Sequence, residues 1–227
     1  MQEERLEDAH KFKLWKKKLT ENNLTINHID EKFTRRNHLG EVLFSTVLLD
    51  ATDPDGRKIP PLCLVKGEVV CILVCLIDNA TQEKYLLLVK QRRIAEGAYT
   101  YEQPAGMVDG TKTPEEIALQ EVREETGIHI TAEQLIDLSK GKRLFPSTGT
   151  SDEAMYFFAC EIYLSKTEIE KFENQKHGEA GENEHITTHV FPFAEAHKKI
   201  NNTNGLLLNY LYLQKVNDYE LLKQLTL

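Results

Sequence analysis

The chain has 227 residues, enough for one large domain or for a core domain with a small extension. Its 28 basic and 36 acidic residues give a formal net charge of −8, which argues against broad binding to nucleic acid or anionic membranes. It has no apolar run long enough to span a bilayer, and its N-terminus is too charged for a secretory signal. We therefore expect a soluble, cytoplasmic protein without nucleic-acid or membrane partners.

The four cysteines follow no spacing that is typical of a metal site or of a disulfide framework. Three of them lie in apolar runs, so we expect small buried hydrophobic side chains in a reducing compartment. The four are Cys63, Cys71, Cys75 and Cys160.

The N-terminal segment, residues 3–20, is highly charged but places Phe12, Trp15 and Leu19 at helical spacing. This pattern predicts an amphipathic helix that covers part of the core or a partner subunit. Stacking of Trp15 on a nucleotide is the alternative. Strand patterns follow, with a turn at 53–56 before the last of them. They are Thr25–Ile29, Glu41–Ala51 and Leu62–Val65.

Two near-continuous apolar runs, Val69–Ile77 and Tyr85–Val89, are separated by the polar residues 78–81. Runs of this kind predict two buried strands joined by a turn. Further elements are expected towards the C-terminus: strands at Ala154–Leu164 and Thr187–Phe191, and helices at Thr131–Leu138, Ser165–Phe172, Phe193–Ile200 and Leu206–Val216. Mixed strands with helices between them fit an α/β/α sandwich.

A helix over residues 114–126 is predicted from both of its ends. Thr113 and Glu116 have the spacing of a capping box, and Pro114 suits the first helical position. Gly127 follows the last helical residue, where a left-handed conformation is easiest for glycine. The sequence therefore fixes where this helix begins and ends.

Three glutamates of this helix, Glu121, Glu124 and Glu125, lie on one side at spacings of three and four. Like charges at these spacings weaken an isolated helix by a few tenths of a kcal/mol per pair. Taken alone, the cluster is typical of a solvated acidic face. A hard divalent cation would also offset the repulsion. The expected packing arc lies beside the carboxylates and consists of Ala118, Leu119 and Val122, while Ile117 falls on the acidic side without explanation.

From Gly106 to Ile128 the sequence resembles the Nudix box, which has a glycine, then a glutamate, then Arg-Glu-x-x-Glu-Glu-x-Gly on a helix. The three glutamates and Gly127 fall in register with it. Two positions depart: Lys112 stands where the family usually has Glu, and Gln120 where it usually has Arg. In family members those two residues can pair and help to fix the loop before the helix.

Segments outside the box resemble nucleotide-sugar pyrophosphatases of the ADP-ribose and ADP-sugar type. They are Gln91-x-Arg93, Glu102-x-Pro-Ala-Gly106, Ser147-x-Gly-x-Ser-Asp-Glu153 and Glu182-Asn-Glu184. The resemblance implies a Nudix-type α/β/α sandwich with a mixed sheet, plus an N-terminal helix and a small β extension. It implies a dimerisation region over residues 1–66, a Nudix hydrolase domain over 67–227, and a homodimer.

The resemblance also implies a set of site residues. The metal ligands would be Ala105 (by its carbonyl), Glu121, Glu124 and Glu125. The catalytic residues would be Glu121 and a general base, for which Glu182 is placed first and Glu184 second, with His177 as an alternative. The substrate-binding residues would be Arg93, Glu102, Gly106, Ser151 and Glu153. Arg92 is the alternative to Arg93, and the loops that carry the others could instead be mere connections. His185 and His189 lack the context of a zinc pair.

The activity implied is hydrolysis of the diphosphate bond of ADP-ribose or an ADP-sugar such as ADP-glucose, with Mg²⁺ as cofactor and Mn²⁺ as the second choice. The products would be a nucleoside monophosphate and a sugar phosphate. Two alternatives stay open: a UDP-sugar pyrophosphatase, and a Nudix-fold binding module without catalysis. The only sequence feature in favour of the binding module is the departure at Lys112 and Gln120.

Overall fold

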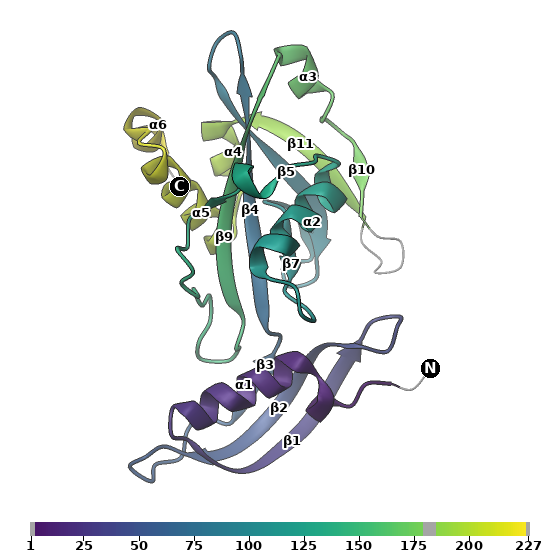
Figure 1. The fold of residues 1–227 in the computed structure, drawn as a ribbon, viewed down its shortest axis with the longest axis vertical. Coiled ribbons are helices and arrows are strands. Elements are labelled where there is room, and N and C mark those ends of the chain that lie inside the picture. Colours follow the sequence, from purple (N-terminus) through teal and green to yellow (C-terminus); the bar gives the residue numbers. More distant parts are fainter. Residues whose placement is uncertain (1–2, 179–184, 226–227) are drawn as a thin grey trace. The chain divides into compact units, whose positions relative to one another are not determined.

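A computed structural model describes residues 3–178 and 185–225 of the chain. The helices are α1 (His10–Glu21), α2 (Pro114–Thr126), α3 (Lys166–Glu170), α4 (Phe193–Lys199), α5 (Thr203–Lys215) and α6 (Tyr219–Gln224), with 3-10 turns at Leu6–Asp8 and Ala132–Gln134. The strands are β1 (Thr25–Arg36), β2 (Val42–Thr52), β3 (Leu62–Val65), β4 (Glu68–Asp78), β5 (Lys84–Arg93), β6 (Ala98–Glu102), β7 (Ala105–Met107), β8 (Ile136–Asp137), β9 (Ala154–Leu164), β10 (Lys176–His177) and β11 (Ile186–Pro192). Figure 1 shows these elements in colours that follow the sequence. No helix in the described part of the chain is long and apolar enough to cross a bilayer.

The chain divides into two compact units. The first contains residues 1–69 together with two later segments, 107–112 and 144–155. The second contains residues 70–106, 113–143 and 156–227. The first unit therefore includes the N-terminal elements and two loops that interrupt the sequence of the second.

In the first unit, the strands β1, β2 and β3 form an antiparallel sheet in that order. Buried side chains alternate along β2, and they share one core with Phe12 and Trp15 of α1. This confirms the predicted amphipathic helix. The strand predicted at Thr25–Ile29 was too short, because the polar residues up to Arg36 also pair with β2. Polar strand residues carry no apolar alternation, so the pattern stops before the strand does.

In the second unit, the larger sheet has the order β10-β11-β5-β4-β9-β8, with β6 paired to β5 and β7 paired to β4. Every residue of β4 from Val69 to Asp78 is buried, which requires cover on both faces of the sheet. Figure 1 shows α2 on one face and α4 and α5 on the other. The predicted α/β sandwich is confirmed.

The predicted helix at Thr131–Leu138 is wrong. Only Ala132–Gln134 turns, as a 3-10 helix that Thr131 and Gln134 close with a capping box. The chain then becomes the short strand β8, because Ile136 and Asp137 pair with Ala159 and Phe158 of β9. A tertiary pairing with distant residues overrides the local helical preference here.

The expectation for the cysteines is confirmed for three of the four. Cys71, Cys75 and Cys160 are buried, while Cys63 is half-buried. Burial raises the pKa of the Cys63, Cys75 and Cys160 thiols to about 12. These three thiols therefore stay protonated at neutral pH and are poor nucleophiles.

The ends of α2 are formed as the sequence predicts. Thr113 Oγ1 accepts a hydrogen bond from the Glu116 amide at 3.2 Å, and Glu116 Oε2 accepts one from the Thr113 amide at 2.8 Å. Gly127 closes the helix with a φ of 73°. Since the carboxylates of interest lie on α2, this cap fixes the part of the chain from which they project.

We predict that Thr113→Ala lowers the free energy of unfolding by about 1 kcal/mol, because amide groups at the start of α2 lose their side-chain acceptor. Urea denaturation measures the change. The matched control is Thr20→Ala, which removes an exposed threonine near the end of α1 whose hydroxyl donates to the Lys16 carbonyl. Equal losses in the two variants would contradict a specific role for the cap.

Candidate functional site

Glu125 of α2 is directed at the backbone of the short strand β7. Its side chain is part of a residue that is only 3% exposed. The Ala105 amide donates a hydrogen bond to Glu125 Oε2 at 3.1 Å. A buried carboxylate is costly unless it is hydrogen-bonded. This contact therefore stabilises the carboxylate and ties α2 to β7.

Glu121 meets the next residue of the same strand. A Cβ added at Gly106 would lie 2.6 Å from Glu121 Cγ and closer still to its carboxylate. Real Cβ atoms essentially never come this close, so any side chain at this position would force the Glu121 side chain to move. Glycine at position 106 therefore lets Glu121 keep its place against β7, a packing role beside its implied role in substrate binding.

The acidic side of α2 is not a solvated face. Ile117, four residues before Glu121, is 5% exposed, and the buried residues of the helix are Ile117, Ala118, Val122, Glu125 and Thr126. Buried positions therefore include both Ile117 and Glu125, on the side where the sequence analysis placed the carboxylates. The burial of Ile117, which the sequence left unexplained, belongs to this packing.

Glu124 is placed differently from the other two glutamates. Gln120 Nε2 donates to Glu124 Oε2 at 3.0 Å, and an Arg123 guanidinium nitrogen lies 3.3 Å from Oε1. The Glu124 side chain is about a quarter exposed, at 27%. Gln120, one of the two departures from the box, thus holds a glutamate of the box across one helical turn.

The donors gathered at β7 suit a hard cation. They are carboxylate oxygens of Glu121 and Glu125 beside two consecutive residues of one strand, and Mg²⁺ and Mn²⁺ favour such oxygen ligands. Among the residues that the structure describes, no three His, Cys, Asp or Glu side chains gather as a metal centre. The chemistry of the donors therefore fits the implied metal, while Glu124 is turned towards Gln120 and Arg123.

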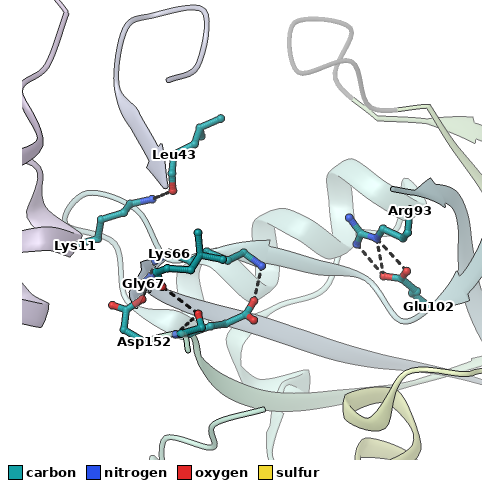
Figure 2. Close-up of polar contacts among 10 residues, drawn as sticks. Lys11, Leu43, Lys66, Gly67, Arg93, Glu102 and Asp152 are labelled. Atoms are coloured by element: carbon teal, nitrogen blue, oxygen red, sulfur yellow. Dashed lines mark hydrogen bonds and ion pairs between the residues drawn. The ribbon is translucent and has the colours of Figure 1, made fainter. Parts of the chain in front are cut away.

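Arg93 and Glu102 form a bidentate ion pair across the β5–β6 hairpin (Figure 2). Arg93 Nε lies 3.0 Å from Glu102 Oε1, and its terminal nitrogen Nη2 lies 2.8 Å from Oε2. The neighbouring Arg92 instead donates to the Gly97 carbonyl at 3.0 Å and stacks on Tyr99. Of the two arginines, Arg93 is therefore the one that the structure brings to Glu102.

Ser151 and Glu153 belong to the first unit, in the loop before β9. Ser151 Oγ donates to the Leu64 carbonyl at 3.1 Å and accepts from the Glu153 amide at 3.1 Å. The Glu153 carboxylate pairs with Lys66. These bonds fasten the loop to the segment that joins β3 and β4, a structural role that the sequence did not distinguish from substrate binding.

Asp152 was not predicted as a key residue, yet it is the centre of that attachment. Asp152 Oδ1 accepts hydrogen bonds from the Lys66 amide at 2.7 Å and from the Gly67 amide at 3.0 Å (Figure 2). The contact joins residues more than eighty positions apart. No local pattern could have revealed it, because a single aspartate in a polar loop has many possible partners.

Lys11 is a second residue that the sequence analysis missed. It is only 7% exposed, and its Nζ donates to the Leu43 carbonyl at 2.8 Å (Figure 2). The same Nζ pairs with Asp109 at 2.8 Å. Asp109 lies in the 107–112 loop, which precedes α2 in the sequence. The Val108 amide also donates to the Glu68 carbonyl at 2.8 Å. The N-terminal helix therefore anchors the loop that leads into α2.

The proposed general bases Glu182 and Glu184 lie outside the described residues. His177, the alternative, has a half-buried ring whose Nε2 is buried without a hydrogen-bond partner in the described part of the chain. Burial lowers its pKa. His189 Nδ1 lies 2.7 Å from Glu173 Oε1, whereas His185 is exposed.

Comparisons with known proteins agree with this architecture. The NUDIX domain family matches residues 67–211. The chain is 32% identical to Nudix hydrolase 14, chloroplastic, of Arabidopsis thaliana over 164 residues, which is 69% of this chain but only about half (52%) of that protein. It is 31% identical to the ADP-ribose pyrophosphatase of Haemophilus influenzae over 171 residues, 67% of this chain and 72% of that protein.

The fold also matches a solved structure described as an ADP compounds hydrolase. The TM-score is 0.60 at 15% sequence identity, and the match covers 86% of this chain and 95% of the other. At this identity the likeness concerns the fold alone. It confirms the sandwich that the sequence predicted.

We predict that Gly106→Ala lowers the free energy of unfolding by about 1–3 kcal/mol, because the added methyl group overlaps the Glu121 side chain. In a Glu121→Ala background the same substitution should cost less than half as much, because the obstructing side chain is gone. Urea denaturation of the four combinations measures the coupling.

Gly149→Ala is the matched control, because a Cβ at Gly149 meets nothing within 4 Å. Its effect should stay within about 0.5 kcal/mol. An equal cost of Gly106→Ala with and without Glu121 would show that the close approach does not determine the glycine.

Proposed function

The chain belongs to the Nudix domain family, and on this premise we propose that it hydrolyses the diphosphate bond of nucleoside diphosphate sugars. The substrate class is ADP-ribose or an ADP-sugar such as ADP-glucose, and the products are a nucleoside monophosphate and a sugar phosphate. The observation that carries the proposal is the placement of Glu121 and Glu125 against β7. The name of the Haemophilus relative, an ADP-ribose pyrophosphatase, supports the choice of substrate.

Attack of water on a diphosphate is slow because the phosphorus atoms are surrounded by negative oxygens. In the proposed site, Glu121, Glu125 and the Ala105 carbonyl would hold a divalent cation, Mg²⁺ before Mn²⁺, with Glu124 as a further ligand. Bound there, such a cation supplies positive charge to the diphosphate oxygens and favours the attack of water.

The protein's contribution is to fix its carboxylates before substrate arrives. The Ala105 amide orients Glu125, and the absence of a side chain at Gly106 admits Glu121. Preorganised charges lose little energy to reorganisation during the reaction. In this scheme Glu182, or Glu184 in second place, accepts the proton of the attacking water.

Substrate binding is assigned to residues on the β5–β6 hairpin, on strand β7 and in the loop before β9. Glu102 holds the Arg93 guanidinium by a fork of hydrogen bonds, and a guanidinium fixed in this way is suited to recognise a phosphate. Gly106, Ser151 and Glu153 complete the proposed set. Ser151 and Glu153 already bond within the first unit, just as Arg93 and Glu102 bond to each other. Arg93 is the stronger candidate because its planar guanidinium suits a phosphate.

We also propose that residues 1–66 form a dimerisation region and that the enzyme is a cytoplasmic homodimer. The β1–β3 part of the first unit exposes large apolar side chains, with Phe33 at 55% and Leu62 at 47%. Contiguous exposed apolar patches mark subunit interfaces, and we propose that these side chains belong to one. Light scattering coupled to size-exclusion chromatography distinguishes a dimer from a monomer.

We predict that the chain hydrolyses ADP-ribose or ADP-glucose in the presence of Mg²⁺ and that a chelator abolishes turnover. Glu125→Gln should lower kcat by about a hundredfold or more, because the residue is assigned as a metal ligand. Glu115→Gln is the control, since this exposed glutamate lies in the first turn of the same helix. Separation of the products from a panel that includes UDP-glucose, diadenosine polyphosphates and 8-oxo nucleoside triphosphates measures the preference.

Faster turnover of UDP-glucose than of every ADP compound would identify a UDP-sugar pyrophosphatase. A protein inert on the whole panel would favour a binding module. Strong activity in the double variant Lys112→Glu/Gln120→Arg would then identify the two departures as the cause. Turnover in Glu125→Gln within a few-fold of the parent would overturn the assignment of the metal ligands.

A separate experiment distinguishes the general base from a metal ligand. If Glu182 accepts the proton, Glu182→Gln should lower kcat with little change in the Mg²⁺ concentration that gives half-maximal activity. A ligand would instead raise that concentration sharply. Glu184→Gln is the paired variant, and near-normal turnover in Glu182→Gln with a loss in Glu184→Gln would move the role to Glu184.

A further inference from the structure

A network of two buried amides and one imidazole lies in the second unit. Gln103, Asn209 and His197 are 5%, 0% and 1% exposed. Gln103 Nε2 donates to Asn209 Oδ1 at 2.9 Å and to the Gly205 carbonyl at 3.2 Å. Asn209 Nδ2 in turn lies 3.1 Å from His197 Nδ1. The network thus joins α4 and α5 to a residue outside both helices.

Gln103 occupies a particular place in the chain. It lies in the two-residue connection between β6, which ends at Glu102, and β7, which begins at Ala105. Glu102 holds Arg93, and the Ala105 amide holds Glu125. The Gln103 side chain therefore anchors this connection to α5, while the Ile72 amide of β4 donates to the Pro104 carbonyl at 2.8 Å.

The first turn of helix α5 packs against the Gln103 side chain. A Cβ added at Gly205 would overlap Gln103 Oε1 and would lie 2.8 Å from Ile200 Cγ2. Asn202 caps the helix through the Gly205 amide at 2.7 Å. The first turn of α5 thus leaves room for the glutamine amide and presents a carbonyl to it.

Stability alone does not account for the network. A buried amide contributes little net free energy even when it is hydrogen-bonded, and an apolar side chain of the same shape is often as stable. Moreover, His197 Nε2 is buried and has no hydrogen-bond partner among the described residues. Hydrogen bonds are directional, unlike apolar contacts. The bonds of Gln103 therefore specify one position of the connection between β6 and β7.

We propose that Gln103 and Asn209 are positioning residues for the candidate site. Their hydrogen bond fixes the connection between β6 and β7, so that Glu102 meets Arg93 and Ala105 meets Glu125. This inference rests on the proposed function for its kinetic consequence, but the positioning itself can be measured without any substrate.

The test compares three variants of α5. Asn209→Leu removes the acceptor for Gln103, Asn209→Asp retains an acceptor oxygen at the same place, and Tyr212→Phe is the control. Tyr212 lies on the same helix and its hydroxyl donates to Glu161 at 2.7 Å. The control therefore loses a buried hydrogen bond that does not lead to the connection.

We expect Asn209→Leu to lower kcat/KM by about 10- to 100-fold, the size of effect that a small misplacement of reacting groups produces. Asn209→Leu should also raise the Mg²⁺ concentration that the enzyme requires. Asn209→Asp should keep most of the parent's activity. Tyr212→Phe should change only the melting temperature. Hydrogen–deuterium exchange provides a readout without substrate. The Ala105 amide should exchange faster in Asn209→Leu than in the parent or in Tyr212→Phe.

Each outcome decides the proposal. Unchanged exchange at Ala105 in a folded Asn209→Leu protein would overturn it, even if the parent were inert on every substrate. A parent protein that is inert on every substrate would contradict the proposed function but not the positioning role. If Asn209→Leu fails to fold, Gln103→Met takes its place, because methionine matches the length of glutamine and makes neither bond. Normal exchange and normal kcat/KM in that variant would likewise refute the positioning role.

Discussion

The second unit depends on the contact between one face of α2 and the backbone of β7. Two glutamates on adjacent turns of the helix meet two consecutive residues of the strand: Glu125 accepts the Ala105 amide, and Glu121 fills the space that a side chain at Gly106 would take. A buried carboxylate without such a donor would cost several kcal/mol. The helix can therefore neither rotate nor slide by one residue without leaving a charge poorly solvated. The capping box at Thr113 serves the same constraint, because it determines where the helix begins.

The contact also concentrates like charge. On an exposed helix, carboxylates four residues apart repel each other by a few tenths of a kcal/mol, but burial lowers the local dielectric and increases the repulsion. A packing arrangement that brings Glu121 and Glu125 together is costly for stability and favourable for holding a cation. Glu124, bonded to Gln120 and partly exposed, has no such cost. Of the three glutamates, Glu121 and Glu125 are thus the two that both pack against β7 and are best placed to hold the proposed cation.

Features with a local cause could be predicted from the sequence. The cap of α2, its last residue and the buried strands β4 and β5 follow from neighbours in the chain, and the structure reproduces them. Features with a long-range cause could not. The Lys11–Asp109 and Asp152–Lys66 contacts join residues 98 and 86 positions apart, and a lone charged residue carries no sign of its partner. The burial of Ile117 and the Gln103–Asn209 bond have the same origin. Helical periodicity gives the arc of a helix but not how much of that arc the rest of the fold covers.

The long-range contacts also bear on the two departures from the Nudix box. Where the family can pair a glutamate with an arginine, this chain has Lys112 and Gln120, and a neutral amide at position 120 cannot form that ion pair. The 107–112 loop is nevertheless fastened: Lys11 reaches Asp109, and the Val108 amide reaches the Glu68 carbonyl. Lys11 is nearly buried, although the Asp109 side chain is 45% exposed, and a partly buried pair is screened less than a fully exposed one. Gln120 meanwhile orients Glu124 by a neutral hydrogen bond. The N-terminal helix therefore helps to hold the loop. The two departures remove the Glu–Arg ion pair of the family, but the contacts of Asp109 and Val108 still fasten the loop.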